Sequence, residues 1–157
     1  MKVMKQINKK LFFKLTLKQV QAIVIYGIKF SISFAFLSAV SDRFGIWGNA
    51  GAQGVSWGDM SHFLSYTAIL TPWSPKALIP FIGWAVTVLE IMLAALLLTP
   101  FKTKEVAFLS GVLLFIFGIS MTVTIGFKAP LDYSVFSASF AAFSLAYLEC
   151  LELNIYD

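Results

Sequence analysis

Long apolar segments restrict the fold of this chain more than any other feature of its sequence. Four of them have the roughly 20 residues that a helix needs to cross a bilayer core about 30 Å thick. They cover about residues 19–40, 77–99, 106–127 and 133–151. Hydrophobic residues make up 59% of the 157 residues, and a chain of this size cannot bury so much apolar surface in its own core. The sequence therefore predicts an integral membrane protein.

Continuous apolar runs predict helices, because the strands of a membrane β-barrel alternate between apolar and polar residues. The expected fold is all-α, with a four-helix membrane bundle as a single domain over residues 1–157. Residues 41–76 form the longest connection and are expected on the outer side. Within that connection, residues 58–70 can form a short helix with Asp59 near its N-terminus, where a carboxylate suits the helix dipole.

Basic residues predict the orientation of this bundle. With four spans both termini share one side, and that side carries more lysines than the other. Because cytoplasmic loops are enriched in basic residues, both termini are expected in the cytoplasm and the chain in a bacterial inner membrane. This asymmetry also explains the net charge of +4 without nucleic-acid binding. The predicted cytoplasmic lysines are Lys2, Lys5, Lys9, Lys10, Lys14, Lys18, Lys102 and Lys104, against Arg43, Lys76 and Lys128 outside.

Residues 1–18 have a helical period of their own, with lysines on the face opposite the apolar residues. Such a basic amphipathic helix is expected to lie on the anionic inner leaflet as an anchor. A docking site for a partner is the alternative. A cleaved signal peptide is not favoured, because the following apolar run is longer than a signal peptide requires. The apolar positions are Val3, Met4, Ile7, Leu11, Phe12 and Leu15.

Two charges lie where hydrophobicity alone would forbid them. Lys29 and Glu90 fall near the middle of the first and second predicted spans, each about 15 Å from the cytoplasmic end. Mid-membrane charges normally face the bundle interior with a partner, so a Lys29–Glu90 ion pair is expected. The pair would either fix helix register or serve as a proton-carrying or ligand-binding site. Lys29 could instead extend along its flexible stem toward the surface, which would dissolve the pair.

The outer connection contains three of the four tryptophans, Trp47, Trp57 and Trp73. They form either an aromatic belt at the membrane surface or a lid over a cavity between the helices. His62 is the only histidine and Cys150 the only cysteine. No metal site is therefore expected, and Cys150 is expected to be an inert thiol.

The last predicted span begins after a proline, and Asp132 stands where it could cap that helix. An Arg43–Asp132 contact would close the outer mouth of the bundle. The span also contains a row of small residues that would allow close helix packing, and an aromatic stripe that would face lipid, a quinone-like ring or another subunit. The small residues are Ser134, Ala138, Ala142 and Ala146, and the aromatic ones are Phe136, Phe140, Phe143 and Tyr147.

Several of these stretches together resemble the DoxX family of small four-helix bacterial membrane proteins. The resemblance covers about residues 29–146, although such sequences would be expected to have Arg where this chain has Lys29. It implies a connection to quinone or thiol redox chemistry and a possible quinone cofactor. It rests on Lys29, Ser38-Ala39-Val40-Ser41-Asp42-Arg43-Phe44-Gly45, Trp57-Gly58-Asp59, His62-Phe63, Tyr66-Thr67, Glu90 and Lys128-Ala129-Pro130-Leu131-Asp132-Tyr133-Ser134-Val135-Phe136.

Three functions follow as hypotheses. The first is a non-catalytic or partner-dependent subunit of a quinone-linked redox system, in which Glu90 exchanges a proton and Lys29 contacts the quinone. The second is a small-solute transporter or binding protein, which would require a homodimer. The third is a membrane scaffold or assembly protein. The expected partners are the lipid bilayer and a soluble or membrane redox protein, and the candidate ligand-contacting residues are Lys29, Glu90, Trp57, His62, Asp132 and Arg43.

Overall fold

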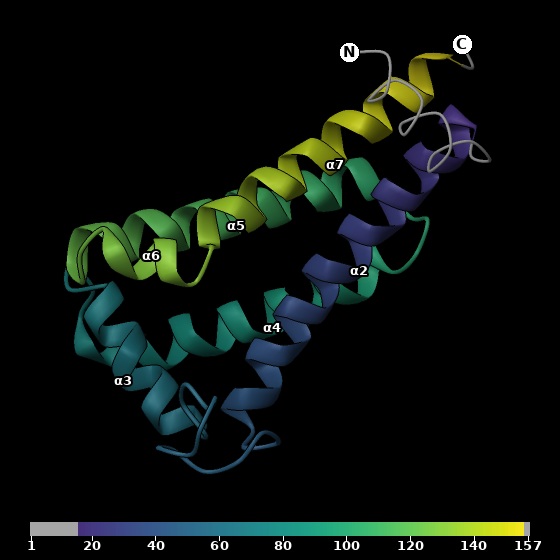
Figure 1. Ribbon diagram of the computed structural model, residues 1–157. Helices are drawn as coiled ribbons and strands as arrows, with labels where there is room; N and C mark the ends of the chain where they lie inside the picture. The colour runs from purple at the N-terminus through teal and green to yellow at the C-terminus, as the bar shows by residue number, and fades with distance from the viewer. Residues whose placement is uncertain (1–15, 156–157) are drawn as a thin grey trace, which may run out of the picture.

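The computed structural model describes residues 16–155, with side chains described for residues 16–151, and their regular secondary structure is entirely helical (Figure 1). The expectation of an all-α fold is confirmed. The long helices are α2 (Leu17–Arg43), α4 (Ile79–Leu97), α5 (Thr103–Thr124) and α7 (Val135–Ile155). The short elements are α3 (Met60–Leu70), the 3-10 helix η1 (Lys76–Leu78) and α6 (Lys128–Asp132).

Three stretches of helix are long and apolar enough to cross a membrane: α2, η1 with α4, and α5. This confirms a membrane protein. The fourth predicted span corresponds to α7. Only its residues 135–151 are described with side chains, and they form an apolar helix of less than 18 residues, so a count of four spans stays a prediction. The predicted amphipathic helix lies largely outside the described residues.

Helix α2 begins before the predicted span of residues 19–40 and ends after it. Thr16 caps its start, since the Thr16 hydroxyl accepts from the Gln19 backbone N–H and the Gln19 side chain accepts from the Thr16 backbone N–H. This reciprocal arrangement is a capping box. The helix then continues for 27 residues to Arg43. Asp42 and Arg43, which were predicted to begin the outer connection, therefore lie on the last turn of a helix.

Helices α5 and α7 lie side by side along most of their length (Figure 1). Two glycines of α5 make this possible, because phenylalanine rings of α7 occupy the space that a side chain would need. A Cβ at Gly111 would stand 2.7 Å from the Phe143 ring, and one at Gly118 would stand 2.6 Å from Phe136. The Ser139 hydroxyl also donates to the Gly111 carbonyl at 2.8 Å. Helix α2 packs against α4 and α7.

The side chains of α7 divide between the α5 interface and the outside of the bundle. Ala142 and Ala146 of the predicted small-residue row are buried. Phe136 and Phe143 of the predicted aromatic stripe fill the space over glycines of α5. Phe140 and Tyr147 are exposed, although the Phe140 ring also contacts Phe115 of α5 at its edge. The predicted stripe is therefore two sets of residues with different surroundings.

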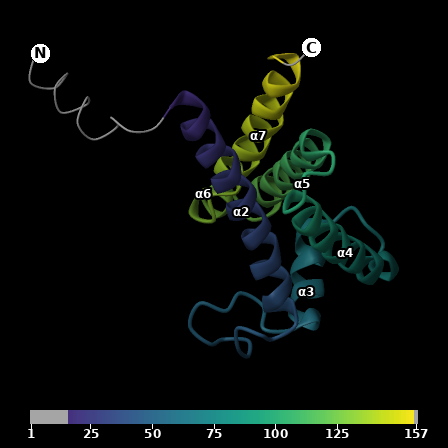
Figure 2. The same ribbon diagram turned by 90° about the vertical axis from the view of Figure 1, so that its right-hand side faces the viewer.

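The connection from residue 44 to residue 59 and helix α3 lie beside the end of α2, at the opposite end of the molecule from the end of α7 (Figure 2). We call this end the α3 end, and the opposite end, where α4 turns into α5, the turn end. Helix α3 falls within the predicted range of residues 58–70. It packs against α4, where a Cβ at Gly83 would stand 2.3 Å from Leu64.

Candidate functional site

A buried ion pair joins the end of α2 to the middle of α4. The Arg43 Nη1 atom lies 2.7 Å from the Glu90 Oε2 atom and donates to the Thr87 hydroxyl at 2.8 Å. Arg43 and Glu90 are each only 2% exposed. Thr87 and Glu90 are three residues apart on α4 and therefore share one face of that helix, which the structure buries. This pair is the centre of the candidate site.

Aromatic rings cover the guanidinium of Arg43. Its Cζ atom lies 3.7 Å from the centroid of the Phe63 ring and 5.3 Å from that of Trp57, distances typical of cation–π contacts. The Trp57 ring also contacts the Phe63 ring edge-on, with the ring centroids 5.1 Å apart, and the Tyr66 ring, with the centroids 5.9 Å apart. Burial and, to a smaller extent, the charge of Tyr133 raise the pKa of Tyr66. The aromatic cover thus seals the ion pair from the α3 end.

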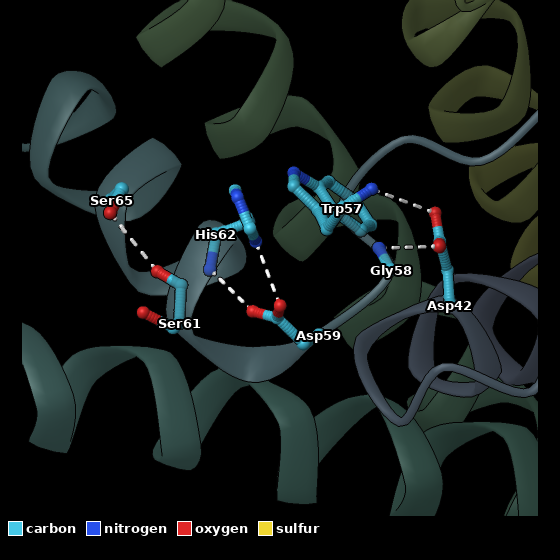
Figure 3. A network of polar contacts seen from close by, with 7 residues as sticks. All are labelled: Asp42, Trp57, Gly58, Asp59, Ser61, His62 and Ser65. Atoms are coloured by element: carbon cyan, nitrogen blue, oxygen red, sulfur yellow. Dashed lines mark hydrogen bonds and ion pairs between the residues drawn. The ribbon is translucent and has the colours of Figure 1, made fainter. Parts of the chain in front are cut away.

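Asp42 holds this cover in place. Its carboxylate accepts hydrogen bonds from the backbone N–H groups of Ser56 at 2.8 Å, Trp57 at 3.3 Å and Gly58 at 3.0 Å (Figure 3 shows its contact with the Trp57–Gly58 segment). Hydrogen bonds to a charged acceptor are stronger than neutral ones. Asp42 therefore fixes the loop backbone while its neighbour Arg43 contacts the Trp57 ring.

The turn at Gly58 requires glycine. Its φ is +73°, and a Cβ there would stand 2.2 Å from the backbone nitrogen of Ala50. The left-handed backbone conformation disfavours other residues, and the contact with backbone leaves no room for a side chain. This close approach allows the connection to fold back over the end of α2.

The ion pair leaves two polar atoms without a well-aligned hydrogen bond in the described chain: the Nε atom of Arg43 and the Oε2 atom of Glu90. The contact between the Arg43 Nη1 and Glu90 Oε2 atoms is therefore a close electrostatic contact in which Nε takes no part. A buried charge of either sign depends strongly on its partner, so removing one of the two side chains leaves the other with little compensation.

His62 lies outside this buried centre. Its Nδ1 atom is 2.8 Å from the Asp59 Oδ2 atom, and its backbone N–H donates to Oδ1 of the same carboxylate at 2.9 Å (Figure 3). The His62 and Asp59 side chains are 60% and 52% exposed. The backbone hydrogen bond from His62, followed by that of its side chain, lowers the pKa of Asp59. Asp59 is thus the N-cap of α3; the sequence had predicted it near the N-terminus of this helix, as a charge that suits the helix dipole.

The predicted Lys29–Glu90 ion pair is wrong. The Lys29 Nζ atom donates to the Thr99 carbonyl at 3.0 Å and to the Thr103 hydroxyl at 3.3 Å. Arg43, rather than Lys29, lies level with Glu90. Lys29 is about 21 Å of helix rise earlier on α2, beside the turn between α4 and α5. Extension of Lys29 away from Glu90 is the alternative that the sequence had left open.

The predicted Arg43–Asp132 contact is also wrong. Asp132 pairs with Lys128 within the short helix α6, and both side chains are exposed. Asp132 is the last residue of α6, and Ser134, with a φ of +54°, separates that helix from α7. Because α6 intervenes before the last long helix, Asp132 does not stand at its start.

Of the six predicted ligand-contacting residues, the structure brings together three, Arg43, Trp57 and Glu90. The contributions of Asp42 and Thr87 were not predicted from the sequence. A signal for Thr87 was present, because its spacing from Glu90 places both on one helix face. Within residues 16–151, no group of three or more His, Cys, Asp or Glu residues is arranged to hold a metal ion.

Residues 56–134, half of the chain, match the family described as methylamine utilisation protein MauE. The chain belongs to the MauE family. No curated protein and no solved structure matches it. The segment matching MauE contains Trp57, Phe63, Thr87 and Glu90, whereas Asp42 and Arg43 precede it.

The resemblance to DoxX is therefore wrong. Much of the sequence on which it rested, from Trp57-Gly58-Asp59 through Glu90 to Ser134, lies inside the segment that matches MauE. Isolated polar residues between apolar helices are what any small membrane bundle needs at its buried contacts and helix ends. Such residues identify the class of protein more securely than they identify one family.

Proposed function

We propose that this MauE-family chain is a non-catalytic, partner-dependent subunit of a membrane redox system that serves methylamine utilisation. The family description supports the link to methylamine. The observation that carries the non-catalytic role is the enclosure of the Arg43–Glu90 pair. Both charges are buried and paired with each other, and Trp57 and Phe63 cover the arginine. The pair's role in this proposal is to hold the α3 end together.

The proposal includes four spans, with α7 as the fourth. Its 21 residues would extend about 31 Å as a helix, close to the thickness of a bilayer core. Both termini and the turn end would then lie in the cytoplasm, as the lysine distribution predicts. The α3 end would face the periplasmic side of a bacterial inner membrane.

In this arrangement the α3 end is the surface that a redox partner would contact. Asp42 holds residues 56–58 by their backbone, and Arg43 holds the ring of Trp57 and the side of α3. The two neighbouring residues thus connect the membrane helices to a defined outer surface. A partner-dependent subunit needs such a surface more than it needs an accessible carboxylate.

Complementation of a host strain that lacks the gene tests this proposal. The deletion should prevent growth with methylamine as nitrogen source, and the wild-type gene should restore it. The double variant Arg43→Met/Glu90→Met should also restore growth, since a buried ion pair can often be replaced by apolar residues. Each single variant should restore less growth and accumulate less protein, because it leaves one unpaired buried charge.

Two outcomes would contradict the proposal. Unimpaired growth of the deletion strain on methylamine would remove the link to that substrate. A double variant that accumulates normally in the membrane but fails to support growth would show that the two charges do more than hold the fold.

A quinone-linked role for Glu90 is the second candidate, because a carboxylate within a membrane-spanning helix is a functional hypothesis by default. The proposed quinone would no longer lie between Lys29 and Glu90, since these residues have separate partners. Mass spectrometry of solvent extracts from purified wild type and Glu90→Gln tests it. A stoichiometric quinone that is lost in the variant would support the role, and its absence from wild type would exclude the proposed site.

A further inference from the structure

An open groove runs between α5 and α7 at the turn end of the molecule. Phe108 and Leu109 of α5 line it together with Phe143, Ala146 and Tyr147 of α7. Its volume is about 770 Å³, within the range of sites that hold small molecules. These side chains are apolar or aromatic, so the groove suits a ligand with a hydrocarbon portion.

The packing of α5 against α7 explains where the groove ends. Phe143 fills the space over Gly111 and contacts Phe108 with ring centroids 5.6 Å apart. These two rings therefore lie at the inner end, where the helices come close. From there the groove extends toward Lys104, in the first turn of α5, and Cys150 of α7. Lys104 is exposed and, with the spans arranged as in the proposed function, lies at the end nearest the membrane surface.

Positive charge predominates around that end. Lys104 and Glu105 both line the groove, so these two charges offset each other. Further lysines occur at the same end of the bundle, and among its described side chains they outnumber the carboxylates. The lysines with exposed side chains are Lys18, Lys102 and Lys104, and the acidic residues are Glu105 and Glu149.

We propose that this groove binds one anionic glycerophospholipid. An acyl chain would lie along Phe108 and Phe143, and the phosphate would be placed near Lys104 at the membrane surface. The apolar lining and the excess of lysines at this end of the bundle match the two ends of such a molecule. Basic residues near a membrane surface each contribute about 1 kcal/mol to the attraction of anionic lipid, which corresponds to about a fivefold change in affinity.

Native mass spectrometry of the full-length protein in detergent tests this assignment. The probes are phosphatidylglycerol and phosphatidylcholine with identical acyl chains. Wild type should bind phosphatidylglycerol several-fold more tightly, and Lys104→Gln should lose about fivefold of that affinity. The matched control is Lys76→Gln, which removes the same charge at the α3 end and should leave the preference unchanged.

A second variant tests the groove itself. Leu109 is exposed while lining the groove, so Leu109→Trp can fill it from the outside without disturbing the buried core. This variant should lower the binding of both lipids. Equal binding of the two lipids by wild type, an unchanged preference in Lys104→Gln, or an equal loss in Lys76→Gln would each overturn the proposal. Retention of a quinone in place of phospholipid would overturn it as well.

Discussion

The guanidinium of Arg43 and the carboxylate of Glu90 lie 2.7 Å apart and are almost completely buried. Arg43 ends α2, whereas Glu90 lies within α4. The contact thus links two helices, and the rings of Trp57 and Phe63 extend it to the connection and to α3. Four separate parts of the chain depend on one ion pair.

Breaking this pair should destabilise the protein more than replacing it. Glu90→Met leaves the Arg43 guanidinium buried and unpaired, at an expected cost of about 3–5 kcal/mol in the free energy of unfolding. The double variant Arg43→Met/Glu90→Met should recover most of that loss. Reversible unfolding in bicelles, followed by circular dichroism, measures both. A double variant as unstable as the single ones would argue against the pair as the source of the effect.

Removing the charge of Asp42 should release the connection from the end of α2. Asp42→Asn loses the charge-assisted component of the hydrogen bonds from Ser56, Trp57 and Gly58. Hydrogen exchange at these three amides should rise by about tenfold, as expected for a loss near 1.4 kcal/mol. Asp59→Asn is the control, since its carboxylate caps α3 and does not touch them. Unchanged exchange in Asp42→Asn would contradict the assigned role.

Gly58→Ala should impair folding more than a comparable change elsewhere in the connection. Its Cβ would meet the Ala50 backbone at 2.2 Å, in addition to the cost of a positive φ. Gly51→Ala is the matched control, because Gly51 has a φ of +88° with nothing within 4 Å of the added Cβ. The yield of monodisperse protein after detergent extraction compares them. Equal yields would show that backbone conformation alone limits this turn.

Acid should loosen the start of α3. Because the pKa of Asp59 is lowered in the folded protein, its ionised form stabilises the fold. This contribution is present above the ordinary pKa of 3.8 and is lost as the pH falls through the lower, folded value. Hydrogen exchange at the His62 amide, corrected for its intrinsic pH dependence, should show reduced protection in that range. In Asp59→Asn, which retains a capping side chain, this acid-induced change should disappear.

Residue chemistry along the chain was sufficient to predict the membrane class, the all-α fold and a short helix within residues 58–70 with Asp59 near its N-terminus. These features depend on local properties: an apolar run must avoid water, and a carboxylate near the N-terminus of a helix is stabilised by the helix dipole. The same reasoning identified Lys29, Arg43, Trp57 and Glu90 as residues of interest. It could not assign their contacts.

Contacts between charges that are far apart in the sequence depend on where α2 ends and on the offset of α2 relative to α4 along their axes. A difference of a few residues in helix length moves a side chain by several ångströms, since each residue adds 1.5 Å. Composition does not encode that offset. The packed helices place Arg43 beside Glu90 and Lys29 beside Thr99, because a buried charge is stable only where the surrounding fold supplies its partner.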